Sequence, residues 1–169
     1  MATPFDDINA IFYNMIEEDG SFFDYYGIDQ EDAELIAQQR ADACLTEAAI
    51  KLSLRIQADI DFTDFDVCAR EFAEDLTKNE CYLLASLQYE EYLFRDIAKL
   101  RANAMHFTSA EQTVFSPANE RKTFMDMYNL IVERNNQLID RYCSKDRLTG
   151  AYKELDYETT DTTDTVSAT

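Results

Sequence analysis

The scarcity of glycine and proline is the feature that most limits what this chain can fold into. Its 169 residues include only 3 Gly and 2 Pro, too few for the many tight turns of a β-sandwich or a β-barrel. A chain of this length fits one domain and can bury a real core, and its apolar share of 46% is normal for a globular protein. The composition therefore predicts a single all-α domain built as a helical bundle.

Apolar residues recur at helical spacing in four stretches. Two stretches carry clear start signals. Thr3 precedes Pro4 as an N-cap before a proline at the first helical position, and Thr77 and Glu80 form a capping box. The expected helices cover about 3–19, 29–56, 77–105 and 116–143. Because short connections favour antiparallel neighbours, we expect the last two to be long antiparallel helices, with shorter N-terminal helices packed against them.

The stretch between the second and third helices, residues 57–75, has the weakest helical pattern. Ile60 and Phe62 alternate with aspartates, which predicts a short, half-exposed strand or an extended link. Four aspartates in eight residues suggest a calcium site: Asp59, Asp61, Asp64 and Asp66. An EF-hand loop, however, needs Gly at its sixth position and Glu at its twelfth, and this stretch lacks both. We interpret the aspartates as a solvated acidic edge, and the sequence leaves cation binding open.

Helical periodicity stops after Tyr142, which divides the chain into a bundle domain at 1–146 and an extended C-terminal arm at 147–169. In the arm, large apolar side chains stand among charges, and we expect five of its residues to bind a partner: Arg147, Tyr152, Lys153, Leu155 and Tyr157. The alternative is that these side chains fold back on the chain's own bundle. The acidic, Thr-rich end, ETTDTTDTVSAT, is expected to be disordered when unbound.

Charge is distributed unevenly along the chain. Residues 1–94 carry 22 acidic and 5 basic side chains, a net charge of −17, whereas residues 95–153 carry 7 acidic and 10 basic ones, a net charge of +3. Such asymmetry suggests a molecule that meets partners, or copies of itself, through oppositely charged ends. It argues against nucleic-acid binding by the N-terminal half, because phosphate contacts need clustered Lys and Arg.

Arg121 and Lys122 are the only adjacent basic pair in the chain. They lie near the start of a predicted helix, where the macrodipole disfavours cations. Local helix stability therefore does not explain them. We expect the pair to bind an acidic surface of a partner, and the alternative is a solvated pair that binds nothing.

The sequence offers little support for an enzyme, a metal site or a bound cofactor. His106 is the single histidine and lies in a link with no candidate nucleophile beside it, so we expect it to be incidental. Nucleotide-binding and nucleophile-elbow motifs are missing, and a di-iron bundle would need two Glu-x-x-His motifs. Asn135 interrupts an apolar helix face and is expected to be a satisfied core amide that can fix helix register.

The cysteines and the N-terminus indicate an intracellular protein that does not enter a membrane. No C-x-x-C pair occurs, so reduced, mostly buried thiols are expected at Cys44, Cys68, Cys81 and Cys143. No stretch approaches the roughly 18 apolar residues that a membrane span needs. The first residues, MATPFDDINA, lack the basic and apolar regions of a signal peptide.

Three stretches of the C-terminal half resemble a known family. They are LTKNECYLLASLQYEEYLFRDIAKL, VFSPANERKTFMDMYNLIVERNNQLIDRY and SKDRLTGAYKELDY, within the span from Leu76 to Tyr157. A capped helix, a loop and a second long helix that ends near I-x-x-Y are similar to the head–tail connector (adaptor) proteins of tailed bacteriophages. The N-terminal 75 residues match that family only in their helical, acidic style.

The resemblance implies a structural virion protein without catalytic residues. Such connectors form a ring beneath the portal protein and extend the channel through which genomic DNA passes without sequence-specific binding. The implied partners are the portal, a tail-side stopper or tail-terminator protein, and copies of the chain itself. The implied location is the head–tail interface of the virion, after assembly in the host cytoplasm. In that setting Arg121 and Lys122 would bridge to an acidic surface of a neighbouring subunit or of the portal.

Two other classes of protein stay open. An acidic inhibitor that mimics DNA is compatible with the net charge of −19. A mimic, however, should spread carboxylates along its whole surface, whereas residues 95–153 are slightly basic. The other class is a soluble helical adaptor with a different partner. Rings in an image of the purified protein with its neighbouring gene products would favour the connector.

Overall fold

The computed structural model describes residues 2–16, 22, 27–104 and 117–153, and it is mostly helical, as predicted. A small sheet of two-residue strands, which the sequence did not predict, accompanies the helices. The elements follow in the order β1 (Thr3–Pro4), α1 (Phe5–Met15), α2 (Gln30–Arg55), β2 (Phe65–Asp66), β3 (Glu71–Phe72), α3 (Lys78–Ala104) and α4 (Pro117–Cys143). Among the described residues, no helix is apolar over enough of its length to cross a membrane.

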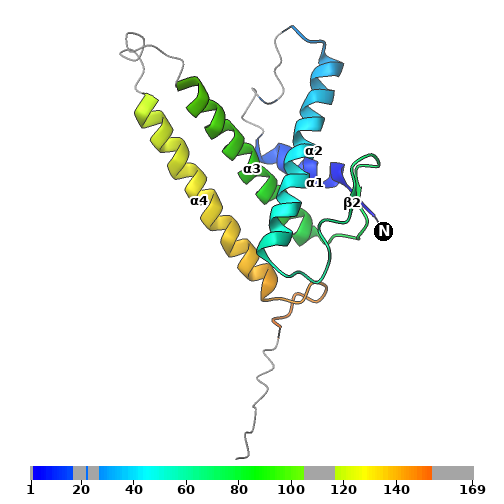
Figure 1. Ribbon diagram of the computed structural model, residues 1–169. Helices are drawn as coiled ribbons and strands as arrows, with labels where there is room; N and C mark the ends of the chain where they lie inside the picture. The colour runs from blue at the N-terminus through cyan, green and yellow to red at the C-terminus, as the bar shows by residue number, and fades with distance from the viewer. Residues whose placement is uncertain (1, 17–21, 23–26, 105–116, 154–169) are drawn as a thin grey trace, which may run out of the picture.

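Helix α3 lies between α2 and α4 (Figure 1) and also packs against α1. Two contacts show that α3 and α4 run in opposite directions. Phe94 of α3 contacts Tyr128 in the first half of α4, whereas Glu80, at the start of α3, contacts Tyr142 at the end of α4. Helix α2 has 26 residues against 27 in each of α3 and α4. Three long helices, rather than two, therefore make up most of the described residues.

The core lies where α1, α2 and α3 meet. Helix α1 presents an apolar face at helical spacing, and α2 presents small side chains that let the helices approach closely. The fully or almost fully buried residues of these two faces include Phe5, Ile8, Phe12, Ala37, Ala41, Ala48 and Ala49. Phe12, Phe22 and Tyr92 then form an aromatic cluster with ring centroids 5.4 to 6.0 Å apart. Edge-to-face packing of this kind is favourable beyond the area that the rings bury.

The capping box predicted at the start of α3 is confirmed. The backbone N–H of Thr77 donates to Oε2 of Glu80 at 2.7 Å, and the N–H of Glu80 donates to Oγ1 of Thr77 at 3.4 Å. Asp29 stands at the N-cap position of α2, as expected, but its side chain makes no capping hydrogen bond. Ser116, the cap expected for α4, lies outside the described residues.

The N-cap predicted at Thr3 is wrong. Helix α1 begins at Phe5, with Pro4 at the N-cap position. Thr3 lies in β1, where its hydroxyl donates to the backbone carbonyl of Glu74 at 3.0 Å and accepts from the N–H of Leu76 at 2.8 Å. The N-terminus is thereby tied to the chain just before α3, and Thr3 satisfies backbone groups that are distant in sequence.

The small sheet has the order β1-β3-β2, with antiparallel pairs. Phe72 pairs with Thr3 on one side and with Phe65 on the other. Arg70 has a φ of 57° in the turn between β2 and β3. The strand considered around Ile60 and Phe62 is not present, because the chain forms bends and turns there and pairs a few residues later.

Candidate partner-binding surfaces

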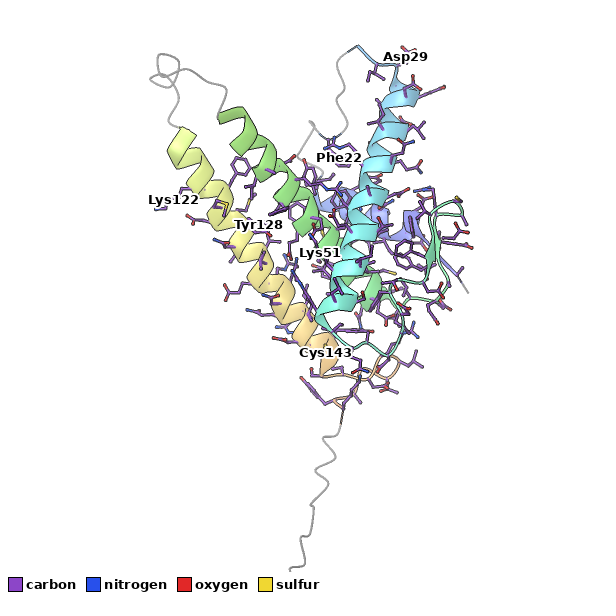
Figure 2. The ribbon with its side chains drawn as sticks, in the orientation of Figure 1. Phe22, Asp29, Lys51, Lys122, Tyr128 and Cys143 are labelled. Atoms are coloured by element: carbon purple, nitrogen blue, oxygen red, sulfur yellow. The ribbon has the colours of Figure 1, made fainter. Side chains whose placement is uncertain are left out.

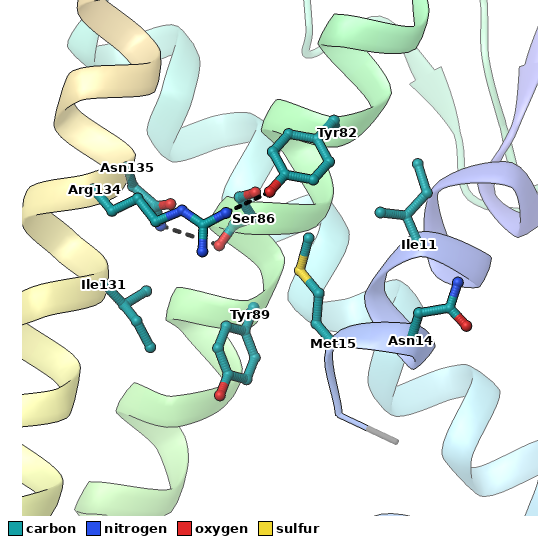
Figure 3. Close-up of a pocket in the computed structure, with 9 residues that line it drawn as sticks. All are labelled: Ile11, Asn14, Met15, Tyr82, Ser86, Tyr89, Ile131, Arg134 and Asn135. Carbon is teal, nitrogen blue, oxygen red and sulfur yellow. Dashed lines mark hydrogen bonds between the residues drawn. The ribbon is translucent and has the colours of Figure 1, made fainter. Parts of the chain in front are cut away.

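A groove with a volume of about 390 Å³ lies between α1, α3 and α4 (Figure 3). Apolar and aromatic side chains dominate its exposed lining. Helix α1 contributes Ile11, Asn14 and Met15, α3 contributes Tyr82, Ser86 and Tyr89, and α4 contributes Ile131, Arg134 and Asn135. An apolar hollow with a few polar groups is the usual form of a ligand or peptide site. Sequence reasoning missed this groove, because its residues come from three helices that are distant in sequence.

Arg134 is the one charged residue among the described residues that line the groove. Its guanidinium donates to the phenol oxygen of Tyr82 at 2.6 Å, across the groove in Figure 3. Among the described residues, no carboxylate forms an ion pair with it. A neutral phenol leaves the positive charge unbalanced, and a guanidinium has further N–H groups to donate. Arg134 can therefore bind an anionic group at the rim of the groove.

Asn135 fixes α4 against α3 beside the groove. It is 1% exposed, and its amide donates to the backbone carbonyl of Ser86 at 3.0 Å and to Oε2 of Glu90 at 2.9 Å. The prediction that Asn135 is a satisfied core amide is confirmed. Arg55 of α2 donates to Oε1 of Glu90 at 3.2 Å, so this carboxylate links three helices. The groove is therefore held in shape by hydrogen bonds beneath its α4 wall.

The basic pair and the acidic start of α2 lie on opposite sides of the molecule. Figure 2 shows Lys122 near the start of α4 and Asp29 just before α2, far from each other. Lys122 is exposed, and the side chain of Arg121 lies outside the described part. Four carboxylates around the start of α2 are exposed: Asp29, Glu31, Asp32 and Glu34. Within the described part of the chain, neither Lys122 nor these carboxylates form an ion pair.

Arg147, predicted to bind a partner, contacts the start of α3 in its own chain. Its guanidinium donates to Oε1 of Glu80 at 2.7 Å and to the backbone carbonyl of Asp75. Glu80 is fully buried and also accepts from the hydroxyl of Tyr142 at 2.9 Å. The carboxylate of Glu80 raises the pKa of Arg147, and burial followed by the hydrogen bond to Glu80 raises the pKa of Tyr142. The beginning of the arm is therefore attached to the bundle, and its binding to a partner stays a prediction.

The remaining predicted arm residues divide into three groups. Lys153 pairs with Asp59 at 3.0 Å, so its charge is used within the chain. Tyr152 is 73% exposed and forms an isolated antiparallel bridge with Lys145, whose ammonium lies 5.2 Å from the centre of its ring. Leu155 and Tyr157 lie outside the described residues. Of the five predicted residues, Tyr152 is thus the one whose described side chain is largely open to a partner.

Two of the four aspartates at 59–66 accept hydrogen bonds from their own loop. Asp61 accepts from the backbone N–H and the hydroxyl of Thr63 at 2.8 and 2.6 Å. Asp66 accepts from the N–H of Cys68 at 2.7 Å. Such local hydrogen bonds stabilise turns. In the described residues, no group of three or more His, Cys, Asp or Glu side chains could hold a metal ion.

The cysteines only partly follow the prediction of buried thiols. Cys44 and Cys81 are buried, whereas Cys68 and Cys143 are exposed, and none of these four described residues is in a disulfide. Burial raises the pKa of the Cys44 and Cys81 thiols, which disfavours the reactive thiolate. His106, the single histidine, lies outside the described residues.

Comparisons with protein-family models, with curated proteins and with solved structures find no match to this chain.

Proposed function

We propose that this protein is a head–tail connector of a tailed bacteriophage. A ring of copies would bind beneath the portal protein, extend the DNA channel and receive the tail through a stopper or tail-terminator protein. The residues from Leu76 to Tyr157 support the proposal through their resemblance to that family. We also propose the finer architecture that goes with this role: a helical bundle at 1–146 and an arm at 147–169 that reaches a partner.

One observation carries the proposal: charges of opposite sign that form no ion pair within the described part of the chain lie on two sides of the molecule. Lys122 stands near the start of α4, and exposed carboxylates such as Glu31 and Glu34 stand in the first turns of α2. A contact between the α4 start of one copy and the α2 start of the next would pair them. Because the two surfaces differ, the contact is heterologous, and repeating it closes into a ring when the rotation allows.

Exposed ion pairs of this kind suit an assembly of many copies better than a contact between two molecules. A single exposed ion pair contributes little, roughly 0 to 1 kcal/mol. Complementary charge, however, sets the register of an interface and disfavours contacts between like charges. In a ring the same contact recurs at every subunit, and the portal would hold the copies close together.

The charge of the N-terminal half is compatible with a DNA channel. Residues 1–94 carry a net charge of −17. An acidic wall repels phosphate, so DNA can cross it without being held. The DNA-mimic alternative gains less support, because many carboxylates are paired within the chain: Asp6, Asp42, Glu47, Asp59, Glu80, Glu90 and Glu91. A mimic needs its carboxylates free along its surface.

Negative-stain electron microscopy tests the proposed function. The protein would be purified together with the portal protein encoded near its own gene. We expect rings stacked coaxially on the portal ring, and we expect the purified protein to add to preformed portal rings. A protein that stays monomeric and does not bind the portal at micromolar concentrations of both would overturn the proposal.

A further inference from the structure

We propose that the groove between α1, α3 and α4 binds the C-terminal segment 154–169 of a neighbouring copy. This inference rests on the proposed function, because a ring brings copies side by side. It adds the surface to which the arm binds and the residues of that surface that bind the arm.

The groove suits a peptide that carries an apolar side chain beside a carboxylate. Ile11, Met15 and Ile131 give it apolar walls, and Tyr82 and Tyr89 add aromatic surface. Arg134 supplies a cation that no described carboxylate balances. Groove-binding peptides take affinity and specificity from apolar anchors in such hollows. An arginine at the rim adds a charge-assisted hydrogen bond to a carboxylate.

The chain itself contains a peptide of this chemistry. Segment 154–169 begins ELDYE, so Leu155 and Tyr157 alternate with acidic residues, and it has 5 acidic residues and no basic one. One side chain of the pair Leu155 and Tyr157 can enter the apolar groove while Asp156 or Glu158 pairs with Arg134. The positive charge of Arg134 is complementary to this acidic sequence. A neutral or basic peptide would not balance that charge.

The segment also starts from a fixed point and is long enough to reach a neighbour. Lys153 is tied to Asp59 at 3.0 Å, and the described chain ends beside the end of α4 (Figure 1). The 16 residues beyond Lys153 span at most about 55 Å when extended. The whole of α4, with 27 residues, is about 40 Å long. The segment can therefore cross from one subunit to the groove of the next.

Photo-crosslinking of the full-length protein tests this inference. Benzoylphenylalanine would replace Tyr157, and rings assembled from a mixture of unlabelled and ¹⁵N-labelled chains would be irradiated and digested for mass spectrometry. We expect crosslinks to peptides that contain Tyr82, Tyr89, Ile131 or Arg134, and mixed-isotope pairs show that the two peptides come from different copies. Crosslinks outside the groove, or exclusively between peptides of the same copy, would overturn the inference.

A charge variant and a matched control sharpen the result. Arg134→Glu should lower the yield of groove crosslinks by at least about fivefold, because a repulsive contact replaces an attractive one. Arg141→Glu reverses an exposed charge on the same helix, outside the groove lining, and should leave the yield unchanged. Equal yields for the two variants would contradict the role of Arg134.

Mass photometry of each sample reports ring formation separately. Rings without groove crosslinks would therefore reject this inference and leave the proposed function standing.

Discussion

Glu80 is a carboxylate without exposed surface that connects three parts of the molecule. It accepts from Thr77 at the start of α3, from Tyr142 at the end of α4 and from Arg147 in the segment that follows α4. Three charge-assisted hydrogen bonds compensate for burying the charge, which would otherwise be costly. The same arrangement attaches the beginning of the arm to the bundle.

The substitution Glu80→Gln should destabilise the fold strongly. It keeps the size of the side chain but leaves Arg147, whose side chain is 16% exposed, without its carboxylate. We expect the free energy of unfolding to fall by about 3 kcal/mol, as when one partner of a buried ion pair is removed. Urea denaturation followed by circular dichroism measures the change. Glu133→Gln, at an exposed position of α4, is the control and should change stability by less than about 0.5 kcal/mol. Equal effects of the two substitutions would contradict this account of Glu80.

Tyr13 should make the fold sensitive to alkaline pH. Burial, followed by the nearby charge of Asp42, raises its pKa from 10.0 to about 12. The folded state therefore holds this proton more tightly than the unfolded state does. The resulting stabilisation is fully present below about pH 10 and is lost as the pH rises through about 12.

Thermal melts between pH 9 and about 12 test that sensitivity. Tyr13→Phe removes the ionisable group, so its melting temperature should fall less steeply than that of the unmodified protein above about pH 10. Tyr152→Phe, at a position that is 73% exposed, should leave the slope unchanged. Identical slopes for Tyr13→Phe and the unmodified protein would exclude Tyr13 as the source.

The contacts of individual residues were the hardest feature to predict from the sequence. The Thr77–Glu80 capping box was predicted correctly, because both partners lie within one helical turn. Thr3 was assigned to a cap because Thr-Pro is a common helix start, but its hydroxyl bonds Glu74 and Leu76, more than 70 positions away. Arg147 and Glu80 are 67 positions apart in sequence, so no local pattern indicates their pairing.

At the scale of elements, Glu90 and Asn135 set the register between α3 and α4, and Arg55 adds α2 to the same contact. A double-mutant cycle with Glu90→Gln and Asn135→Ala should give a coupling energy of about 1 kcal/mol, since contacting residues in one polar network do not act independently. The control cycle pairs Asn135→Ala with Glu91→Gln. Glu91 is the next residue along α3 and binds Lys51 instead. A control coupling as large as the first would mean that Asn135 acts on the helix as a whole.

The helices were predictable because their signals are local. The N-cap at Asp29, the capping box and Pro117 located the starts of α2, α3 and α4 within one or two residues. The sheet was missed because each strand has two residues, which is too short for an alternating pattern. Its pairs also join Thr3 to Phe72, and tertiary contacts such as the packing of Phe5 against Phe72 bring these strands together.

At the scale of the whole molecule, the acidic N-terminal half should keep the protein from holding DNA. Residues 1–94 carry a net charge of −17, and the whole chain carries −19. We therefore expect no binding of a double-stranded fragment at 50 mM salt in a fluorescence polarisation assay, because this negative charge repels the phosphates and residues 1–94 have only 5 basic side chains to displace counterions. Tight binding that weakens as the salt concentration rises would contradict the acidic channel wall.

The candidate surfaces were predictable only where charge alone defines them. The asymmetry between residues 1–94 and 95–153 and the pair Arg121 and Lys122 are visible in the sequence. The opposite placement of Lys122 and Asp29 needs the fold, because it depends on how α2 and α4 lie on either side of α3. The groove needs the fold as well, since α1, α3 and α4 each supply part of its lining.

The most direct test of the connector account is a charge-swap experiment on ring assembly, read by negative-stain electron microscopy. Arg121→Glu with Lys122→Glu should abolish rings while leaving the melting temperature of the monomer unchanged, because exposed charges contribute little to folding. Glu31→Lys with Glu34→Lys should do the same from the other side of the contact. Arg141→Glu, an exposed charge elsewhere on α4, serves as the control and should still form rings. Combining the four substitutions in one chain should restore rings, since the two reversed surfaces again attract each other. Rings that form normally with Arg121→Glu and Lys122→Glu would contradict the account.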